Sequence, residues 1–131
     1  MERVVQSQRQ TDKTGRHKWI KVWTEEWLDG SIREQLTPVE RSIWIDLLVM
    51  AGRSRTPGIV QSNPNKAYSH AYLAGRFKVA LNVLETALKR LKEQQRITEN
   101  EVGITIINWD VYQGGKAKEK LHYPMSNANK E

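Results

Sequence analysis

The amino-acid sequence predicts a mainly helical α+β domain, and three features of its hydrophobic pattern indicate this fold class. The segment TPVERSIWIDLLVMAG, residues 37–52, is typical of a long buried helix. Residues 70–94 predict two shorter helices separated by a break at Lys78-Val79. Residues 96–109 alternate around a turn and predict a two-stranded hairpin. A long helix, a helix pair and a hairpin, in this order, are typical of a winged helix-turn-helix.

The long helix carries clear signals for its start and its end. Thr37 is the expected N-cap, Pro38 occupies the first helical position, and Glu40 completes a capping box. Gly52 is the expected end. Residues 43–51 contain one polar side chain, so the helix is buried on more than one side. We expect the central helix of the domain, with a face against another subunit as the alternative.

The helix pair and the strands follow from shorter patterns. The first helix of the pair is expected to begin near Ser69 and to pack inward through Tyr72, with Ala74-Gly75 allowing another helix to approach closely. The alternating segment WIKVW, residues 19–23, predicts a strand, and GIV before Gln61 is long enough for another short one. The second hairpin strand is expected to run through GITIINW. The second helix of the pair has a leucine-spaced core face: Leu81, Leu84, Leu88 and Leu91.

The composition indicates one globular domain inside the cell. A chain of 131 residues with 38% hydrophobic residues is long enough for one core. The absence of cysteine excludes disulfides and thiolate metal sites. The sequence has no apolar run of the roughly 20 residues that a membrane span needs, and its N-terminus has no apolar signal core. We therefore expect an intracellular protein without a membrane partner.

The charge is unevenly distributed along the chain. The net charge of +6 favours a polyanionic partner, although a basic surface can also serve solubility alone. Both ends of the chain are polar and basic. We expect a flexible basic N-terminal arm over residues 1–18, a winged-helix domain over residues 19–112 and a flexible basic tail over residues 113–131.

The start of the second helix of the pair holds the first candidate DNA-binding residues. Lys78 could reach a phosphate, Asn82 an adenine edge, Thr86 a thymine methyl group, and Lys89 a guanine or a phosphate. Ordinary solvated helix residues are the alternative interpretation. Two features oppose DNA contact here: Glu85 lies on the same outer face, and the hairpin tip TENEVG is acidic.

Further candidate cations lie in the loops and in the N-terminal arm. Arg53 and Arg55 follow the long helix, and Arg76 flanks the break in the helix pair. Arg16 and Lys18 belong to the N-terminal arm, which could follow a groove or a single strand. Disorder without a binding role is the alternative for both ends.

The aromatic and histidine residues give little support to catalysis. The five tryptophans could stack on unpaired bases, but Trp44 and Trp109 have the spacing of core residues, and Trp19 or Trp23 is the better candidate for exposure. The three histidines are scattered and show no metal-ligand spacing. The sequence has no phosphate-binding glycine loop and no nucleophile motif. We expect no catalytic residue, no cofactor and no metal.

Five segments of the chain resemble a known family: WIKVW, ERSIWIDLLVMAGRS, LAGRF, ALKRLKEQQRI and GITIINWDVYQ. They are similar to the N-terminal domain of phage replisome organisers, which are related to the DnaD-like primosomal replication proteins. The similarity covers about residues 19–113, and IINWDVYQ is its most specific part.

The resemblance implies a winged-helix fold in which the N-terminal strand joins the wing sheet. It also implies a role in starting DNA replication in the cytoplasm of a bacterial host cell: binding origin DNA, self-association, and recruitment of the replicative helicase or its loader. Some relatives use this domain for self-association more than for DNA contact. Longer relatives carry a further C-terminal domain that these 131 residues lack.

Three hypotheses about function follow. The first is a non-enzymatic protein that binds double-stranded DNA as a homo-oligomer during phage-type replication initiation. The second is a winged-helix oligomerisation scaffold for primosome assembly with little direct DNA contact, which the acidic hairpin tip favours. The third is a transcriptional repressor with the same fold.

Overall fold

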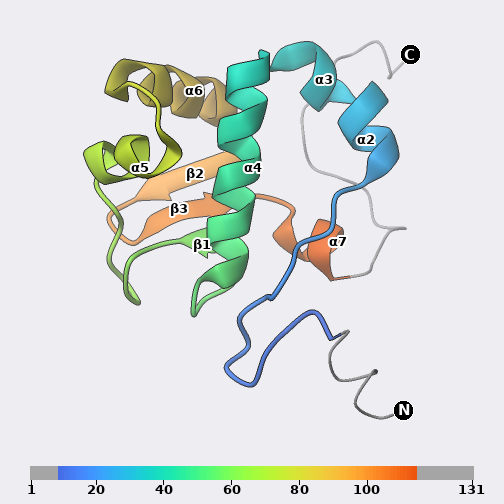
Figure 1. Cartoon of the computed structure of the whole chain (residues 1–131), viewed down its shortest axis with the longest axis vertical. Helices are drawn as coiled ribbons and strands as arrows, with labels where there is room; N and C mark the ends of the chain where they lie inside the picture. Colours follow the sequence, from blue (N-terminus) through green and yellow to red (C-terminus); the bar gives the residue numbers. More distant parts are fainter. Residues whose placement is uncertain (1–8, 115–131) are drawn as a thin grey trace.

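The computed structural model describes residues 9–114, and expectations for residues 1–8 and 115–131 lie outside this range. Helices make up about half of the described residues and accompany one small antiparallel sheet, which confirms the α+β class (Figure 1). No described helix is both long and apolar enough to cross a membrane. In chain order the elements are α2 (Thr24–Asp29), α3 (Ser31–Gln35), α4 (Pro38–Arg53), β1 (Ile59–Val60), α5 (His70–Phe77), α6 (Leu81–Glu93), β2 (Ile97–Asn100), β3 (Gly103–Ile106) and α7 (Trp109–Gln113).

The central position of α4 is confirmed. The helix contacts α6, β1 and β3, and Figure 1 shows α5 and α6 on one side of it and α2, α3 and α7 on the other. The expected capping box is present: the Glu40 backbone N–H donates to the Thr37 hydroxyl (3.2 Å), and the Thr37 N–H donates to the Glu40 carboxylate (3.0 Å). The helix continues one residue past Gly52. Its buried apolar side chains are Ile43, Trp44, Leu47, Met50 and Ala51.

The break between the helices of the pair is also confirmed. The Ser69 hydroxyl accepts from the Tyr72 N–H at 3.0 Å and starts α5. Lys78 ends it in the left-handed region, with φ 63° and ψ 41°. The Val79 N–H then donates back to the Ala74 carbonyl at 3.0 Å. These bonds satisfy the last carbonyls of α5 and turn the chain into α6.

The sheet has the strand order β1-β3-β2. The hairpin pairs Ile97 with Ile106 and Asn100 with Gly103, as the alternating pattern predicted. β1 pairs with the other edge of β3, Val60 lying opposite Ile104. The side chains that face the helices, Val60, Ile97, Ile104 and Ile106, are each at most 3% exposed.

The prediction that an N-terminal strand joins this sheet was wrong. Residues 19–23 are extended but pair with no strand, and β1 is the third strand instead. These residues pair with no strand because the Gln113 side chain takes the hydrogen bonds that a neighbouring strand would make with Lys21. The Lys21 N–H donates to the Gln113 amide oxygen at 2.8 Å, and the Gln113 amide nitrogen donates to the Lys21 carbonyl at 3.0 Å. One buried glutamine thus satisfies the backbone groups of Lys21.

The prediction that the second hairpin strand runs through Trp109 was also wrong. β3 ends at Ile106, and Asn108 adopts φ 69°, a left-handed conformation that asparagine tolerates better than most residues. The chain turns there into α7. The turn directs Trp109 back toward the core, where it is 8% exposed.

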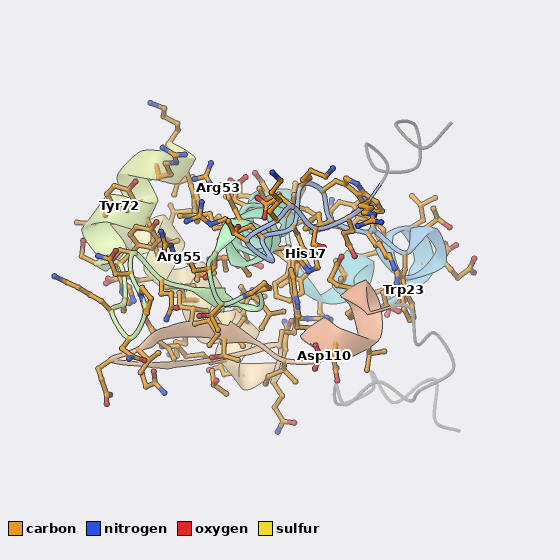
Figure 2. All side chains as sticks on the ribbon, turned by 90° about the horizontal axis from the view of Figure 1, so that it is seen from below. His17, Trp23, Arg53, Arg55, Tyr72 and Asp110 are labelled. Atoms are coloured by element: carbon orange, nitrogen blue, oxygen red, sulfur yellow. The ribbon has the colours of Figure 1, made fainter. Side chains whose placement is uncertain are left out.

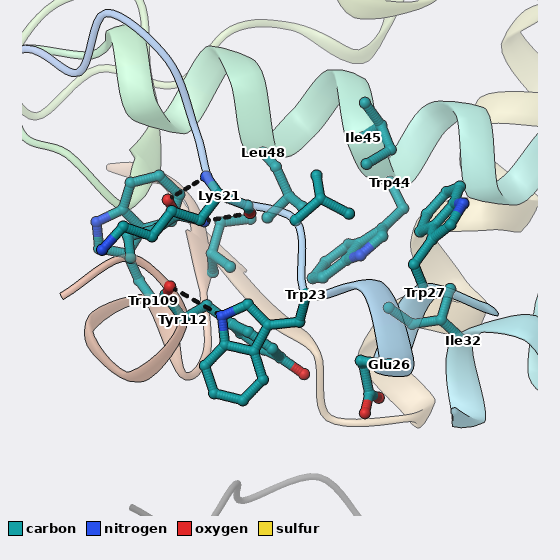
Figure 3. A pocket seen from close by; sticks show the side chains of 13 residues that line it. Lys21, Trp23, Glu26, Trp27, Ile32, Trp44, Ile45, Leu48, Trp109 and Tyr112 are labelled. Carbon is teal, nitrogen blue, oxygen red and sulfur yellow. Dashed lines mark hydrogen bonds between the residues drawn. The ribbon is translucent and has the colours of Figure 1, made fainter. Parts of the chain in front are cut away.

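The tryptophans lie mainly in one apolar slot between the extended N-terminal segment, α2, α4 and α7 (Figure 3). Trp44 is 2% exposed, which with the burial of Trp109 confirms that both belong to the core. Trp23 donates its indole N–H to the Tyr112 carbonyl at 3.2 Å, and Trp19 is 45% exposed. The slot encloses about 30 Å³, room for about one water molecule and not for a nucleobase.

Two glycines allow a matched test of the packing. Gly103 has φ 150°, and a Cβ there would stand 2.5 Å from the Val60 carbonyl oxygen. The expected close helix approach at Gly75 is absent, because nothing in the described residues lies within 4 Å of a Cβ at that position. We predict that Gly103→Ala lowers the free energy of unfolding by about 1–3 kcal/mol from backbone strain alone, and that Gly75→Ala raises it by about 0.5–1 kcal/mol. Urea unfolding of both variants measures this, and a loss of stability of the same size in both would refute the assigned hairpin register.

Candidate nucleic-acid interface

One face of α6 is open to solvent. Its buried row, Leu84, Ala87, Leu88 and Leu91, faces the core. The predicted contact residues Asn82, Thr86 and Lys89 are all exposed, and Lys78 is exposed at the corner that precedes the helix. With 3.6 residues per turn, positions 82, 86 and 89 form one strip opposite the buried row. The structure therefore places these three predicted residues on a single helix face of the shape that can enter a major groove.

One acidic residue beside this strip, Glu85, contacts His70, whereas Glu93 at the end of α6 is exposed. The Glu85 carboxylate lies 3.0 Å from Nδ1 of His70, whose Nε2 lies 2.6 Å from the Glu99 carboxylate. The other Glu99 oxygen accepts from the Lys92 ammonium at 2.6 Å. This group, the His70 cluster (His70, Glu85, Lys92, Glu99), joins α5, α6 and β2. It directs Glu85 toward the flank of α6 and partly neutralises its charge.

The His70 cluster shifts two pKa values in opposite directions. Burial lowers the pKa of His70, but the carboxylates of Glu85 and Glu99 outweigh it, so the pKa stands above its usual value. Burial raises the pKa of Glu99, but hydrogen bonds from Lys92 and His70 outweigh it, so that pKa stands below its usual value. Both shifts favour the charged forms, and the cluster is a set of ion pairs when His70 is protonated.

A further ion pair fixes the C-terminal half of α6 against α4. The Arg90 guanidinium lies 2.9 Å from the carboxylate of Glu40, which is only 7% exposed. The same carboxylate caps the start of α4. One buried acid therefore sets both the beginning of the central helix and the position of the candidate DNA-contacting helix.

The N-terminal segment of the described chain packs on the domain and positions Arg16. The His17 N–H donates to the Gly52 carbonyl at 2.7 Å, and the His17 ring lies 5.3 Å from the Trp109 ring. Gln10 donates to the Gln113 amide oxygen at 3.1 Å. These contacts hold residue 16 against the end of α4.

Three of the predicted cations converge there. Arg16, Arg53 and Arg55 line one polar hollow of about 480 Å³, which we call the arginine hollow. Figure 2 shows Arg53 and Arg55 between His17 and Tyr72 in a view from below. The other side chains lining the arginine hollow are Met50, Ser54, Gln61, Ser62, Asn63, Pro64 and Tyr68.

The remaining predicted cations lie on other surfaces. Arg76 and Lys78 border a second hollow together with Tyr72, on the outer side of α5. The expectation that Tyr72 packs inward was wrong: it is 46% exposed and stacks on Tyr68 instead. Lys18 is exposed on the N-terminal segment. The nine predicted residues thus fall on several surfaces and not on one.

Figure 1 shows α6 beside the N-terminal part of α4, and the chain leaving the other end of α4 toward β1. The Glu40–Arg90 pair attaches α6 near the first turn of α4, whereas the arginine hollow lies at its last turn. The 16 residues of α4 span about 24 Å at 1.5 Å per residue. The α6 strip and the arginine hollow share no residue, and Lys78, which borders the second hollow, directly precedes α6.

The residues that surround the three arginines in the arginine hollow were not predicted from the sequence. Two of them, Asn63 and Tyr68, lie in the loop between β1 and α5 and reach the arginine hollow only through the fold. The only sequence signal for the His70 cluster is the position of His70 at the start of α5. Its partners Glu85, Lys92 and Glu99 come from other elements and carry no such signal. In the described residues, no group of three or more histidine, cysteine or acidic side chains could hold a metal ion.

Comparison with known proteins identifies the family of the chain. A family model described as the N-terminal phage replisome organiser matches residues 19–131. No curated protein and no solved structure matches the chain. The chain belongs to the family of N-terminal phage replisome organisers, as the sequence resemblance indicated. Membership points to a role in phage replication initiation, in a family that is typically non-enzymatic.

The His70 cluster predicts a pH-dependent stability. A histidine whose pKa is higher in the folded chain stabilises the fold below its unfolded pKa of about 6.5, and this contribution is lost as the pH rises through the folded value. We predict that His70→Gln lowers the free energy of unfolding by about 0.5–1 kcal/mol at pH 6 and by less at pH 8.5.

Urea unfolding at the two pH values measures this difference. Glu101→Gln is the control, since Glu101 is exposed at the hairpin tip and takes part in no ion pair among the described residues. His17 has a pKa lowered by burial and by Lys21, and it contributes equally to all three proteins. If the free energy of unfolding depends on pH equally in the wild-type chain and in His70→Gln, protonation of His70 does not stabilise the fold.

Proposed function

We propose that this chain is a winged helix-turn-helix protein that binds double-stranded DNA through the exposed strip of α6 during phage replication initiation. The observation that carries the proposal is the position of Asn82, Thr86 and Lys89 on the open face of a helix that follows a tight corner. Chains of this kind act by binding, and the proposal assigns no catalytic residue.

The topology supports the winged-helix part of the proposal. The order α4, β1, α5, α6, β2, β3 and the sheet order β1-β3-β2 put a hairpin directly beside the helix pair. The left-handed corner at Lys78 sets the angle at which α6 leaves α5. The hairpin occupies the position of a wing, next to the strip that would face the groove.

The charge distribution supports helix contact more than hairpin contact. Glu85, the acid beside Asn82 and Thr86, is paired with His70, although the exposed Glu93 remains at the far end of α6. The hairpin tip instead carries exposed Glu101, which would repel a phosphate backbone. We therefore propose that α6 and nearby basic residues contact the DNA, and that the hairpin lies beside the duplex without binding its phosphates.

A second role, self-association, is favoured by exposed apolar side chains. Among the described residues Val22, Leu28, Val39 and Val49 are each at least 46% exposed. Leu28 and Val22 lie on α2 and on the segment before it, outside the proposed DNA-binding face. We include a homo-oligomer in the proposal, and a replicative helicase or its loader as the partner that such an assembly would serve.

Two substitutions separate base contact from charge. We predict that Lys89→Ala weakens binding to all duplexes and lowers the slope of log affinity against log salt by about 1. Asn82→Ala should leave that slope unchanged. It should reduce the discrimination between the preferred base and the other bases at one position by about 1–3 kcal/mol. The preferred base is determined by selection from a pool of random duplexes.

Fluorescence anisotropy at two salt concentrations gives the salt slopes. Lys13→Ala is the matched control, because it removes the same charge from an exposed turn of the N-terminal segment. If Lys13→Ala weakens duplex binding as much as Lys89→Ala, net charge and not the α6 strip holds the DNA. The absence of duplex binding at low salt would refute the proposal.

Light scattering tests the self-association. We predict an oligomer that Leu28→Lys shifts toward the monomer, because burying an unpaired ammonium in an apolar contact is unfavourable. Lys13→Ala should leave the molar mass unchanged. A wild-type chain that stays monomeric at high concentration would contradict this part of the proposal.

A further inference from the structure

We propose that the arginine hollow and the neighbouring tyrosine stack form a binding site for single-stranded DNA, separate from the α6 strip. The site consists of Arg16, Arg53, Arg55, Tyr68 and Tyr72, and it continues to Arg76 and Lys78. It extends the proposed function, since the strip residues Asn82, Thr86 and Lys89 line neither hollow, and only Lys78, at the corner before α6, adjoins both sites.

The arginine hollow has the chemistry of a phosphate site. Three guanidinium groups from two distant segments line it, and none of the residues lining it is acidic. Arg53 and Arg55 form no ion pair with a described residue. The acid on the described N-terminal segment, Asp12, accepts hydrogen bonds from Thr14 and from the Arg16 backbone. The Thr14 hydroxyl is the main cause of its lowered pKa, and the charge of Arg16 is a smaller one.

One donor in the arginine hollow has no partner in the described part of the chain. The Nε–H of Arg16 is buried and makes no hydrogen bond there. A buried donor without an acceptor is unfavourable, and an anionic oxygen is the acceptor that a guanidinium binds best. Together with the convergence of like charges, this favours a bound phosphate group.

The tyrosine stack supplies a surface for a base. The Tyr68 and Tyr72 rings lie 4.8 Å apart with an interplanar angle of 9°, and Tyr68 also lines the arginine hollow. Tyr72 is the outer ring of the pair and is 46% exposed. An exposed aromatic ring beside a phosphate site is the combination that holds unpaired bases.

The second hollow extends the path along which a single strand could lie. Tyr72 lines it together with Arg76 and Lys78 on the outer side of α5. Basic groups therefore lie on both sides of the tyrosine stack, which matches a base with a phosphate before and after it. A free nucleotide would use only one of the two basic positions.

The geometry favours a single strand over a duplex. A duplex keeps the faces of its bases stacked on each other, so an aromatic ring cannot lie on them without unstacking. An unpaired base can lie flat on Tyr72 while its phosphates reach into the hollows. The volume of the arginine hollow, about 480 Å³, lies within the roughly 300–1,000 Å³ of ligand pockets.

The test is the binding of labelled oligothymidylate to the full chain, followed by fluorescence anisotropy. We expect Tyr72→Ala to weaken binding about tenfold or more, since the loss of one stacked base has effects of this size. Tyr72→Phe should retain the affinity, because the ring remains. The double variant Arg53→Ser/Arg55→Ser should weaken binding and reduce its salt dependence.

Matched controls distinguish this site from the rest of the surface. Trp19→Ala removes an aromatic ring that is equally exposed but lies outside the arginine hollow, and it should leave binding unchanged. Asn82→Ala and Lys89→Ala should weaken duplex binding and keep oligothymidylate binding, so failure of either site is distinguishable from failure of the other. Circular dichroism confirms that each variant is folded.

Three outcomes would overturn the inference. Unchanged binding in both Tyr72→Ala and Arg53→Ser/Arg55→Ser would show that the strand binds elsewhere. Equal loss in Tyr72→Phe and Tyr72→Ala would exclude stacking. Binding of oligouridylate as tight as that of oligothymidylate would remove the assignment to DNA.

Discussion

The burial of α4 is the constraint on which the rest of the structure depends. Leu47 and Ala51 are fully buried and Trp44 nearly so, and the helix contacts the sheet through β1 and β3 and contacts α6 directly. A helix surrounded in this way removes several hundred Å² of apolar surface from water, at roughly 25 cal/mol per Å². Every element that carries a candidate contact residue is attached to this helix or to a neighbour of it.

Polar contacts at both ends of α4 and near its middle fix where the charged side chains lie. At the first turn, Glu40 both caps the helix and pairs with Arg90, so α6 cannot slide along α4 without leaving a buried carboxylate unpaired. In the middle, the buried Arg96 lies 5.9 Å from the Trp44 ring and donates to Ser31 at 2.8 Å, which joins the start of β2 to α3. At the last turn, the Gly52 carbonyl accepts from His17 and brings the N-terminal segment to Arg53.

The sequence predicted the elements whose signals are local. The capping box at Thr37, the start of α5 at Ser69 and the leucine row of α6 depend on residues three or four positions apart. The structure has all of them except Leu81 of that row, which was predicted to face the core but is 44% exposed at the first residue of α6. The same locality explains why the exposed strip of α6 could be predicted: the positions opposite a buried leucine row must face outward.

The errors arose where a distant side chain decides the backbone. Residues 19–23 have the composition of a strand, but the Gln113 side chain, more than 90 residues away in the sequence, satisfies the backbone groups of Lys21. The arginine hollow has the same origin, since Arg16 joins Arg53 and Arg55 only through the contacts of His17 with Gly52 and Trp109. The error at Tyr72 is of another kind: it has the spacing of a core residue, but its ring stacks on the nearby Tyr68 and stays half exposed.

That the two proposed sites share none of their main contact residues has a physical consequence for replication initiation. A protein that holds a duplex at α6 and an unpaired strand at the arginine hollow can bind both at once only if the sites do not overlap, and Asn82, Thr86 and Lys89 line neither hollow. Once one part of a DNA molecule is bound, the second contact becomes intramolecular, so simultaneous occupancy would favour DNA in which a duplex adjoins an opened strand. Such a junction forms wherever an origin begins to melt, so the same arrangement that separates the sites would retain the chain at the place where replication starts.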